Sequence, residues 1–164
     1  MQSPNLIILV QMTLVLALIY LAYIDLTSFR LPNALTIPLI FLGLMFNFLT
    51  PLRFTNSTNA LLGCVLGYGF VWLMNFIYRS LKKQSGIGMG DAKLLAALGA
   101  WLGADALPEI LLIASLSGLV GGLLWLKWQK SQINHPFPFG PFLAFAGIIE
   151  LLWPQAIQTY LLIQ

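Results

Sequence analysis

Two aspartates, Asp25 and Asp91, are the residues of this sequence best placed to do chemistry. Asp25 ends one apolar run and Asp91 opens another, in a chain of 164 residues with only 5 acidic side chains. Two carboxylates that share one proton can activate a water molecule and protonate a peptide carbonyl, which is the chemistry of aspartic proteolysis. The competing interpretation is that both are solvated helix-end residues, with Asp91 as an N-terminal cap. Position alone leaves both interpretations open.

The apolar runs around these aspartates predict the elements that hold them. The chain is 59% hydrophobic and 8% charged, whereas a typical soluble domain carries about a quarter charged residues. Long unbroken apolar runs favour helices in a membrane. We therefore predict an all-α, polytopic membrane helix bundle of about six transmembrane helices, in a single domain covering residues 1–164. The predicted spans are Leu6–Ile24, Ala34–Leu49, Ala60–Tyr78, Asp91–Gly103, Leu107–Leu126 and Phe139 to about Ile163.

Two of these spans are irregular. The fourth is shorter than the roughly 20 residues needed to cross a bilayer, so a buried or re-entrant helix is its alternative. The sixth contains Glu150 and Pro154, which predict a helix that ends early or kinks. Glu150 is expected to face the bundle interior or to reach the outer surface, and we do not assign it to catalysis.

Basic residues in short loops predict the orientation, because such residues stay on the cytoplasmic side. They follow the first, third and fifth spans: Arg30, then Arg79, Lys82 and Lys83, then Lys127 and Lys130. Both termini are therefore expected outside. Asp25 and Asp91, 66 positions apart (91 − 25), are both expected at the cytoplasmic boundary. Because Asp25 ends a predicted helix and Asp91 begins one, helix dipoles predict that Asp25 is the more readily protonated.

Three short motifs accompany the aspartates. Gly88-Met89-Gly90-Asp91 is a GxGD sequence, Asp25 is followed by Pro32-Asn33, and a Pro-Phe-Gly-Pro element occupies residues 138–141. The glycines before Asp91 either let a substrate strand approach closely or form a plain flexible turn. The Pro-Phe-Gly-Pro element either marks the start of the last helix or forms a rigid surface beside the site. A phosphate-binding loop is not favoured, because no strand is expected before the glycines and Lys93 does not complete a Walker pattern.

Together the motifs resemble those of the type IV prepilin peptidases, a family of GxGD aspartic proteases, in the right order and over nearly the whole catalytic core. The resemblance implies that Asp25 and Asp91 are catalytic and remove the basic leader of type IV prepilins or pseudopilins by cleavage after a glycine. It places the reaction on the cytoplasmic side of the bacterial inner membrane, in contact with membrane lipid. The further residues that it assigns to substrate binding or to the shape of the site are Gly88, Gly90, Lys93, Pro138, Gly140 and Pro141.

The remaining polar residues predict little additional chemistry. Lys93 either snorkels to lipid headgroups or tunes Asp91, and we favour tuning. His135 is expected to be solvent-exposed in a loop, because the chain supplies no obvious partners for a metal site. Cys64 is the only cysteine, and we expect no metal and no other cofactor. The scattered basic residues form no dense stripe, so nucleic acid is not an expected partner.

Three other activities are alternatives or additions to the peptidase. Many family members also N-methylate the new N-terminus, an activity associated with an additional N-terminal region that commonly holds two cysteine pairs; because this sequence begins at the span before Asp25, we expect a compact peptidase without it. A six-helix transporter with Asp25 and Asp91 as proton or cation sites and a noncatalytic assembly subunit are the rival classes. The presenilin and signal-peptide-peptidase group shares GxGD, but the motifs around Asp25 and at residues 137–144 fit prepilin peptidases better.

Overall fold

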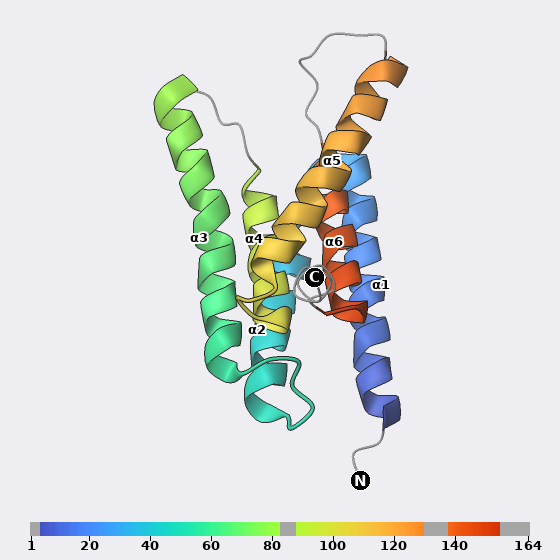
Figure 1. Ribbon diagram of the computed structural model, residues 1–164, viewed down its shortest axis with the longest axis vertical. Helices are drawn as coiled ribbons and strands as arrows, with labels where there is room; N and C mark the ends of the chain where they lie inside the picture. Colours follow the sequence, from blue (N-terminus) through green and yellow to red (C-terminus); the bar gives the residue numbers. More distant parts are fainter. Residues whose placement is uncertain (1–3, 83–87, 130–137, 155–164) are drawn as a thin grey trace, which may run out of the picture.

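The computed structural model describes residues 4–82, 88–129 and 138–154. Within these ranges the chain forms six helices and no strand, which confirms the predicted all-α class (Figure 1). The helices are α1 (Pro4–Ser28), α2 (Asn33–Leu49), α3 (Ser57–Lys82), α4 (Met89–Leu102), α5 (Leu107–Gln129) and α6 (Gly140–Leu152). Lys83, Lys130, His135 and the last residues of the predicted sixth span lie outside the described residues.

The helices differ in length. α1, α3 and α5 contain stretches long and apolar enough to cross a membrane, namely Asn5–Ser28, Ser57–Leu81 and Leu107–Leu124. α2 and α6 are shorter apolar helices, and α4 has 14 residues. α6 ends at Leu152, which confirms the early end predicted from Pro154, because the residue before a proline is pushed out of the helical conformation.

α4 is the interior helix of the bundle. It packs against α2, α3 and α6, and the stretch from Leu94 to Trp101 is buried throughout. This short run is thus a buried helix, and whether it crosses the membrane stays a prediction. Small side chains make up much of its surface, which lets neighbouring backbones come close. They are Ala92, Ala96, Ala97, Gly99 and Ala100.

The contact between α3 and α4 is made by backbone on backbone. A Cβ atom on Gly99 would overlap the carbonyl group of Gly63, and a Cβ on Gly67 would lie 2.7 Å from the carbonyl oxygen of Leu95. Glycine is thus required at these positions by the approach of the neighbouring helix. This contact fixes the height of α4 against α3, and with it the height of Asp91.

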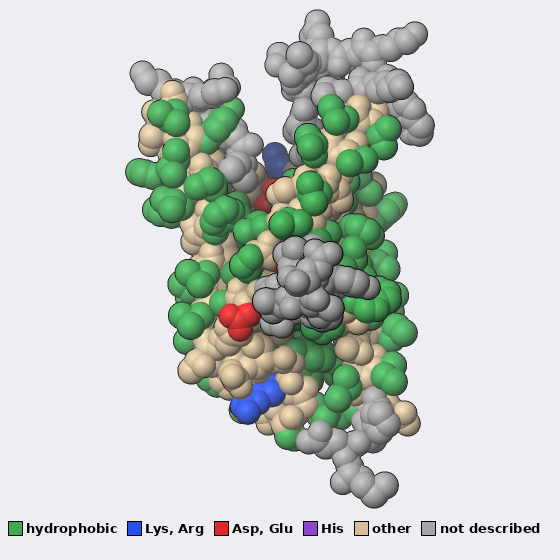
Figure 2. Space-filling view, viewed as in Figure 1, with side chains coloured by type: hydrophobic (Ala, Val, Ile, Leu, Met, Phe, Trp, Pro, Cys, Tyr) green, Lys and Arg blue, Asp and Glu red, His purple; other side chains and the backbone are tan. Residues whose placement is uncertain are grey.

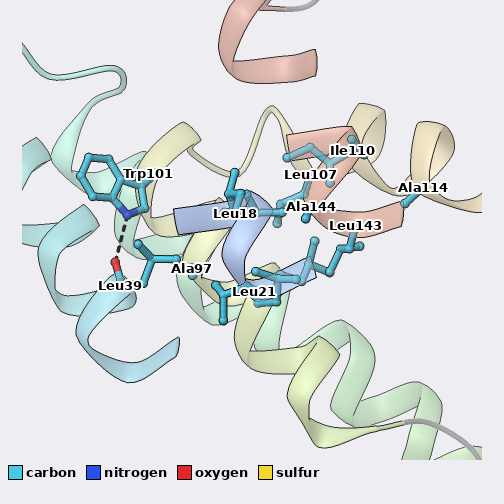
Figure 3. Packing of buried hydrophobic residues seen from close by; sticks show 14 of the residues in the cluster. Leu18, Leu21, Leu39, Ala97, Trp101, Leu107, Ile110, Ala114, Leu143 and Ala144 are labelled. Atoms are coloured by element: carbon cyan, nitrogen blue, oxygen red, sulfur yellow. Dashed lines mark hydrogen bonds between the residues drawn. The ribbon is translucent and has the colours of Figure 1, made fainter. Parts of the chain in front are cut away.

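α4 is also anchored to α2 by polar side chains. Asn47 is almost fully buried, donates to the carbonyl oxygens of Ala100 and Trp101, and accepts from the backbone N–H groups of Phe54 and Thr55. The Trp101 indole N–H donates to the carbonyl oxygen of Leu39 (Figure 3). These bonds hold the C-terminal end of α4, so its N-terminal end has a defined position too.

α1 is held by α6, which in turn packs against α5. Leu18 and Leu21 of α1 belong to the same buried apolar cluster as Leu143 and Ala144 of α6 (Figure 3). α6 begins at the end of the bundle where α1 ends. The packing therefore brings the first turn of α6 beside the last turns of α1.

The α3–α4 contact predicts the effect of adding a single methyl group. Gly99→Ala should lower the free energy of unfolding by about 1–3 kcal/mol, the usual cost of overpacking, because its Cβ meets the backbone of Gly63. Denaturant titration in detergent would measure this. Gly69→Ala is the matched control, since a Cβ at Gly69 meets nothing within 4 Å; it should leave the free energy of unfolding unchanged or raise it, because alanine is the better helix former. Equal stability of the two variants would contradict the contact.

Candidate active site

Asp25 lies near the end of α1 and is only 6% exposed. Its Oδ2 accepts a hydrogen bond of 3.1 Å from the backbone N–H of Gly140. Gly140 is the first residue of α6, and the N–H groups of a first helical turn have no partner within their own helix. Asp25 therefore caps a helix that begins 115 residues later in the chain (140 − 25).

Gly140 has to be glycine for this contact. A Cβ at that position would lie 2.6 Å from Asp25 Oδ2 and 3.0 Å from its carboxyl carbon. The predicted site residue Gly140 is thus in direct contact with a predicted catalytic carboxylate. Pro138 is buried, and Pro141 is half-buried within the first turn of α6, where a proline is tolerated because it lacks only an N–H that the helix does not use.

Asp91 is the third residue of α4, and its backbone N–H donates to the carbonyl oxygen of Gly88. α1 ends and α4 begins at the same end of the bundle (Figure 1), so Asp25 and Asp91 lie at that end, and their joint action on a substrate stays a prediction. Each aspartate lies at the N-terminal end of a helix. Asp91 belongs to the first turn of α4, and Asp25, although it is part of α1, contacts the first turn of α6. The end of α1 is only one part of the surroundings of Asp25, because the Gly140 N–H also faces its carboxylate. The order in which the two carboxyls protonate stays a prediction.

The chain between Asp25 and α2 turns sharply. The backbone N–H of Phe29 donates to the carbonyl oxygen of Asp25, and Phe29 has a φ of 52°, a left-handed conformation that is strained for a residue with a bulky side chain. Pro32 then precedes the first residue of α2. The turn keeps Asp25 and Asn33 at the same end of the bundle.

Two residues of α4 hold this turn in place. A Cβ on Gly90 would lie 2.9 Å from Leu31 Cβ and 3.4 Å from its backbone nitrogen, so Gly90 permits close contact with the turn. The Lys93 ammonium donates to Asn33 Oδ1 and so links α4 to the start of α2. A tuning effect of Lys93 on Asp91 stays a prediction.

Gly88 has a different environment from Gly90 and Gly140. Its backbone is extended, with φ −67° and ψ 129°, which any residue can adopt. A Cβ there would lie at an ordinary 3.6 Å from Asp91 Oδ2, and the residue is exposed. Gly88 thus leaves an accessible stretch of extended backbone beside Asp91.

We call the end of the bundle that holds Asp25, Asp91 and Gly140 the carboxylate end. Figure 2 shows a hollow there between the ends of α3 and α5, with acidic and basic side chains at its bottom. At the other end, Glu150 is buried and lines a cavity of about 190 Å³ with Asn59 and Asp105. This confirms that Glu150 faces the bundle interior, away from the carboxylate end.

Sequence reasoning missed three contributors to the site. In the sequence Asn33 stands out only as part of a motif, and Leu31 does not stand out at all. Asn75 of α3, which donates to Met89 Sδ, falls within a predicted apolar span. A lone amide side chain inside a predicted membrane helix was the available signal for Asn75. For Leu31, no local pattern distinguishes it from any other turn residue.

The chain is similar to proteins of one family. Residues 12–123 match the type IV leader peptidase family. A prepilin leader peptidase/N-methyltransferase from Aeromonas hydrophila is 43% identical over 88% of this chain and 49% of its own length. Proteins of the same name are 44% identical in Dickeya chrysanthemi, over 80% of this chain and 46% of theirs, and 41% identical in Burkholderia pseudomallei strain K96243, over 84% and 44%. The chain thus spans about half the length of these relatives. No solved structure matches it.

The contact between Asp25 and Gly140 predicts an energetic coupling. Gly140→Ala should lower the free energy of unfolding by about 1–3 kcal/mol in the wild-type background, because the new Cβ meets Asp25 Oδ2. In an Asp25→Ala background the carboxylate is gone, so the same change should cost less than half as much. Denaturant titrations of the four proteins of this double-mutant cycle would measure the coupling. Additive effects would contradict it.

Proposed function

Because this chain belongs to the type IV leader peptidase family, we propose that it is an aspartic endopeptidase that removes the leader from type IV prepilins or pseudopilins. The observation that carries the proposal is that Asp25 meets the N-terminal end of α6, while Asp91 lies in the first turn of α4 at the same end of the bundle. Each belongs to one of the motifs that resemble this family. The cut would follow a glycine and leave the apolar segment of the substrate in the membrane.

The two carboxylates would act on a shared water molecule. One, ionised, accepts a proton from the water, and the other, protonated, donates to the oxygen of the scissile carbonyl. Two carboxylates at close range do not both ionise readily, so a pair that shares one proton is the natural resting state. The Gly140 N–H fixes the orientation of the Asp25 carboxyl, which supports a preorganised site.

The substrate would approach Asp91 along the exposed, extended backbone at Gly88. Gly90 contributes indirectly, because its contact with Leu31 holds the turn that follows Asp25. Pro138 and Pro141 stiffen the start of α6 and so keep the Gly140 N–H aimed at Asp25. In this proposal Lys93 positions the start of α2 through Asn33.

The membrane setting follows from the outer surface of the bundle. Leu16 of α1, Val65 of α3 and Leu119 of α5 are each about 60% exposed or more, which suits contact with lipid chains. Arg30 and Arg79 flank the carboxylate end, whereas Arg53 lies in the α2–α3 connection at the other end. By the distribution of basic residues, we place the carboxylate end in the cytoplasm, both termini outside, and about six helices in the bacterial inner membrane.

The peptidase is favoured over a proton- or cation-coupled transporter by the match to the leader peptidase family. The same match disfavours a noncatalytic assembly subunit. The two alternatives predict different effects of replacing Asp25 and Asp91. A transporter would lose gradient-driven flux when the aspartates are neutralised, whereas an assembly subunit would tolerate their replacement.

Asp25→Asn and Asp91→Asn should each lower the rate of prepilin cleavage by about 100-fold to 10,000-fold, the range of general acid–base catalysis. The assay is conversion of a prepilin-like substrate, with a basic leader ending in Gly before an apolar helix, in membranes that contain equal amounts of each variant. Asp105→Asn is the matched control, because Asp105 pairs with Asn59 away from the site, and it should cleave normally. Activity that survives either of the first two changes would refute the mechanism.

The orientation can be tested with single cysteines. In a Cys64→Ser background, Ser28→Cys probes the carboxylate end and Thr58→Cys the opposite end; both positions are exposed. In intact cells with a permeable outer membrane, an impermeant maleimide should label Thr58→Cys at once and Ser28→Cys only after the inner membrane is opened. Cys64→Ser alone should stay unlabelled. The reverse pattern would place the carboxylates outside.

A further inference from the structure

Asn75 is a buried amide whose hydrogen-bonding capacity is not used. It lies in α3 and is 6% exposed. Its Nδ2 donates only to the sulfur of Met89, at 3.6 Å, and within the described residues its buried Oδ1 has no hydrogen-bond partner. A buried polar atom without a partner costs free energy, and in an apolar helix leucine would fill the same space without that cost. Its presence therefore requires an explanation beyond packing.

Asn47 shows what a structural asparagine looks like in the same protein. Its amide makes two donor and two acceptor bonds to backbone groups of α4 and of the α2–α3 connection, so its capacity is fully used. Asn75 has the same side chain and a similar degree of burial, yet makes one weak contact. The difference identifies Asn75 as a residue whose missing partner is not part of the described fold.

Asn75 lines a cavity of about 510 Å³ beside the GxGD motif. Met89, two positions before Asp91, forms one wall, and Arg79 and Ser80 lie toward the end of α3. Trp72 and Phe76 supply an apolar face, with their rings stacked 5.6 Å apart. The cavity thus combines an unpaired amide, an exposed guanidinium and an aromatic face next to a proposed catalytic residue.

The chemistry of this lining selects among ligands. A side-chain amide carries one carbonyl acceptor and N–H donors, so it can pair with a peptide group in both directions. An acyl chain would leave Oδ1 unpaired, and an inorganic anion would bind Arg79 but offer no donor to Oδ1. The five N–H donors of Arg79 suit the carbonyl oxygens of an extended chain. A polypeptide main chain is therefore the ligand that uses every group present.

We propose that this cavity is a peptide-binding subsite, in which Asn75 pairs with the main chain of the substrate next to the scissile bond. The inference rests on the proposed function for the identity of that peptide. In the free protein the Asn75 amide stays in its weak contact with Met89. Because the terminal torsion of asparagine is broad, the amide turns toward the peptide at little cost. Asn75 then holds the scissile bond at the depth of Asp91.

The test is binding to the full chain in lipid nanodiscs. The probe is a fluorescent synthetic peptide with a basic leader ending in Gly and the first residues of an apolar segment. Binding is measured in an Asp25→Asn background, so that no cleavage occurs. Asn75→Leu should weaken binding about tenfold, the loss of one good hydrogen bond, while thermal unfolding occurs at the same or a higher temperature. Asn75→Gln, which keeps an amide, should recover part of the affinity.

Two further variants sharpen the result. Asn47→Leu makes the identical substitution at a fully bonded amide, so it should lower the unfolding temperature, in contrast to Asn75→Leu. Arg79→Gln changes an exposed residue and is expected to fold; it should weaken binding about tenfold. Unchanged affinity in Asn75→Leu or in Arg79→Gln would overturn the subsite, as would a wild type that does not bind the probe.

Cleavage is scored separately on chains with both aspartates intact. If the wild type binds the probe in an Asn75-dependent way but cleaves no prepilin-like substrate, the subsite stands and the proposed peptidase activity fails. If the wild type cleaves and Asn75→Leu cleaves with an unchanged KM, the activity stands and the subsite fails. A higher KM with a nearly unchanged kcat in Asn75→Leu supports both.

Discussion

The hydrogen bond from the Gly140 N–H to Asp25 Oδ2 is the contact on which the proposed site depends. A carboxyl group that is almost fully buried needs polar partners, and the unpaired N–H groups at the start of a helix are the partners that the backbone offers without a side chain. The bond can form only because residue 140 has no Cβ. It also requires that α6 lie against α1, which the apolar contacts among Leu18, Leu21 and Leu143 provide. The orientation of Asp25 thus depends on the packing of the apolar core.

The length of α4 sets the depth of the other aspartate. With 14 residues, α4 is roughly 21 Å long, whereas the 26 residues of α3 extend roughly 39 Å. Since the glycine contact fixes α4 against α3, the short helix begins well below the end of its long neighbour (Figure 1). Asp91 therefore lies below the rim of the hollow, with α2, α3 and α6 packed around its helix. Low dielectric surroundings strengthen every charge interaction within such a site.

The sequence predicted the elements better than their contacts. Apolar runs locate all six helices because burial in lipid or in a bundle imposes the same local pattern. Alternation of the loops predicted that Asp25 and Asp91 share one end, which needs only the order of the helices. The local pattern could not predict that Asp25 caps α6 or that Lys93 bonds to Asn33. Those features depend on which helices become neighbours. The sequence around residue 25 does not indicate that residue 140 will lie beside it.

Two asparagines that look alike in the sequence differ in the hydrogen bonds that they make. Asn47 and Asn75 both carry an amide within an apolar helix, and both are buried. A buried amide needs hydrogen-bond partners from the protein, from ordered water or from a ligand. Asn47 uses its full capacity to hold α4 against α2, and its role ends there. The unpaired oxygen of Asn75 instead lies next to a cavity and next to the motif of Asp91. An amide that is costly to the folded chain and adjacent to its proposed chemistry is better explained by the bound state than by the free one.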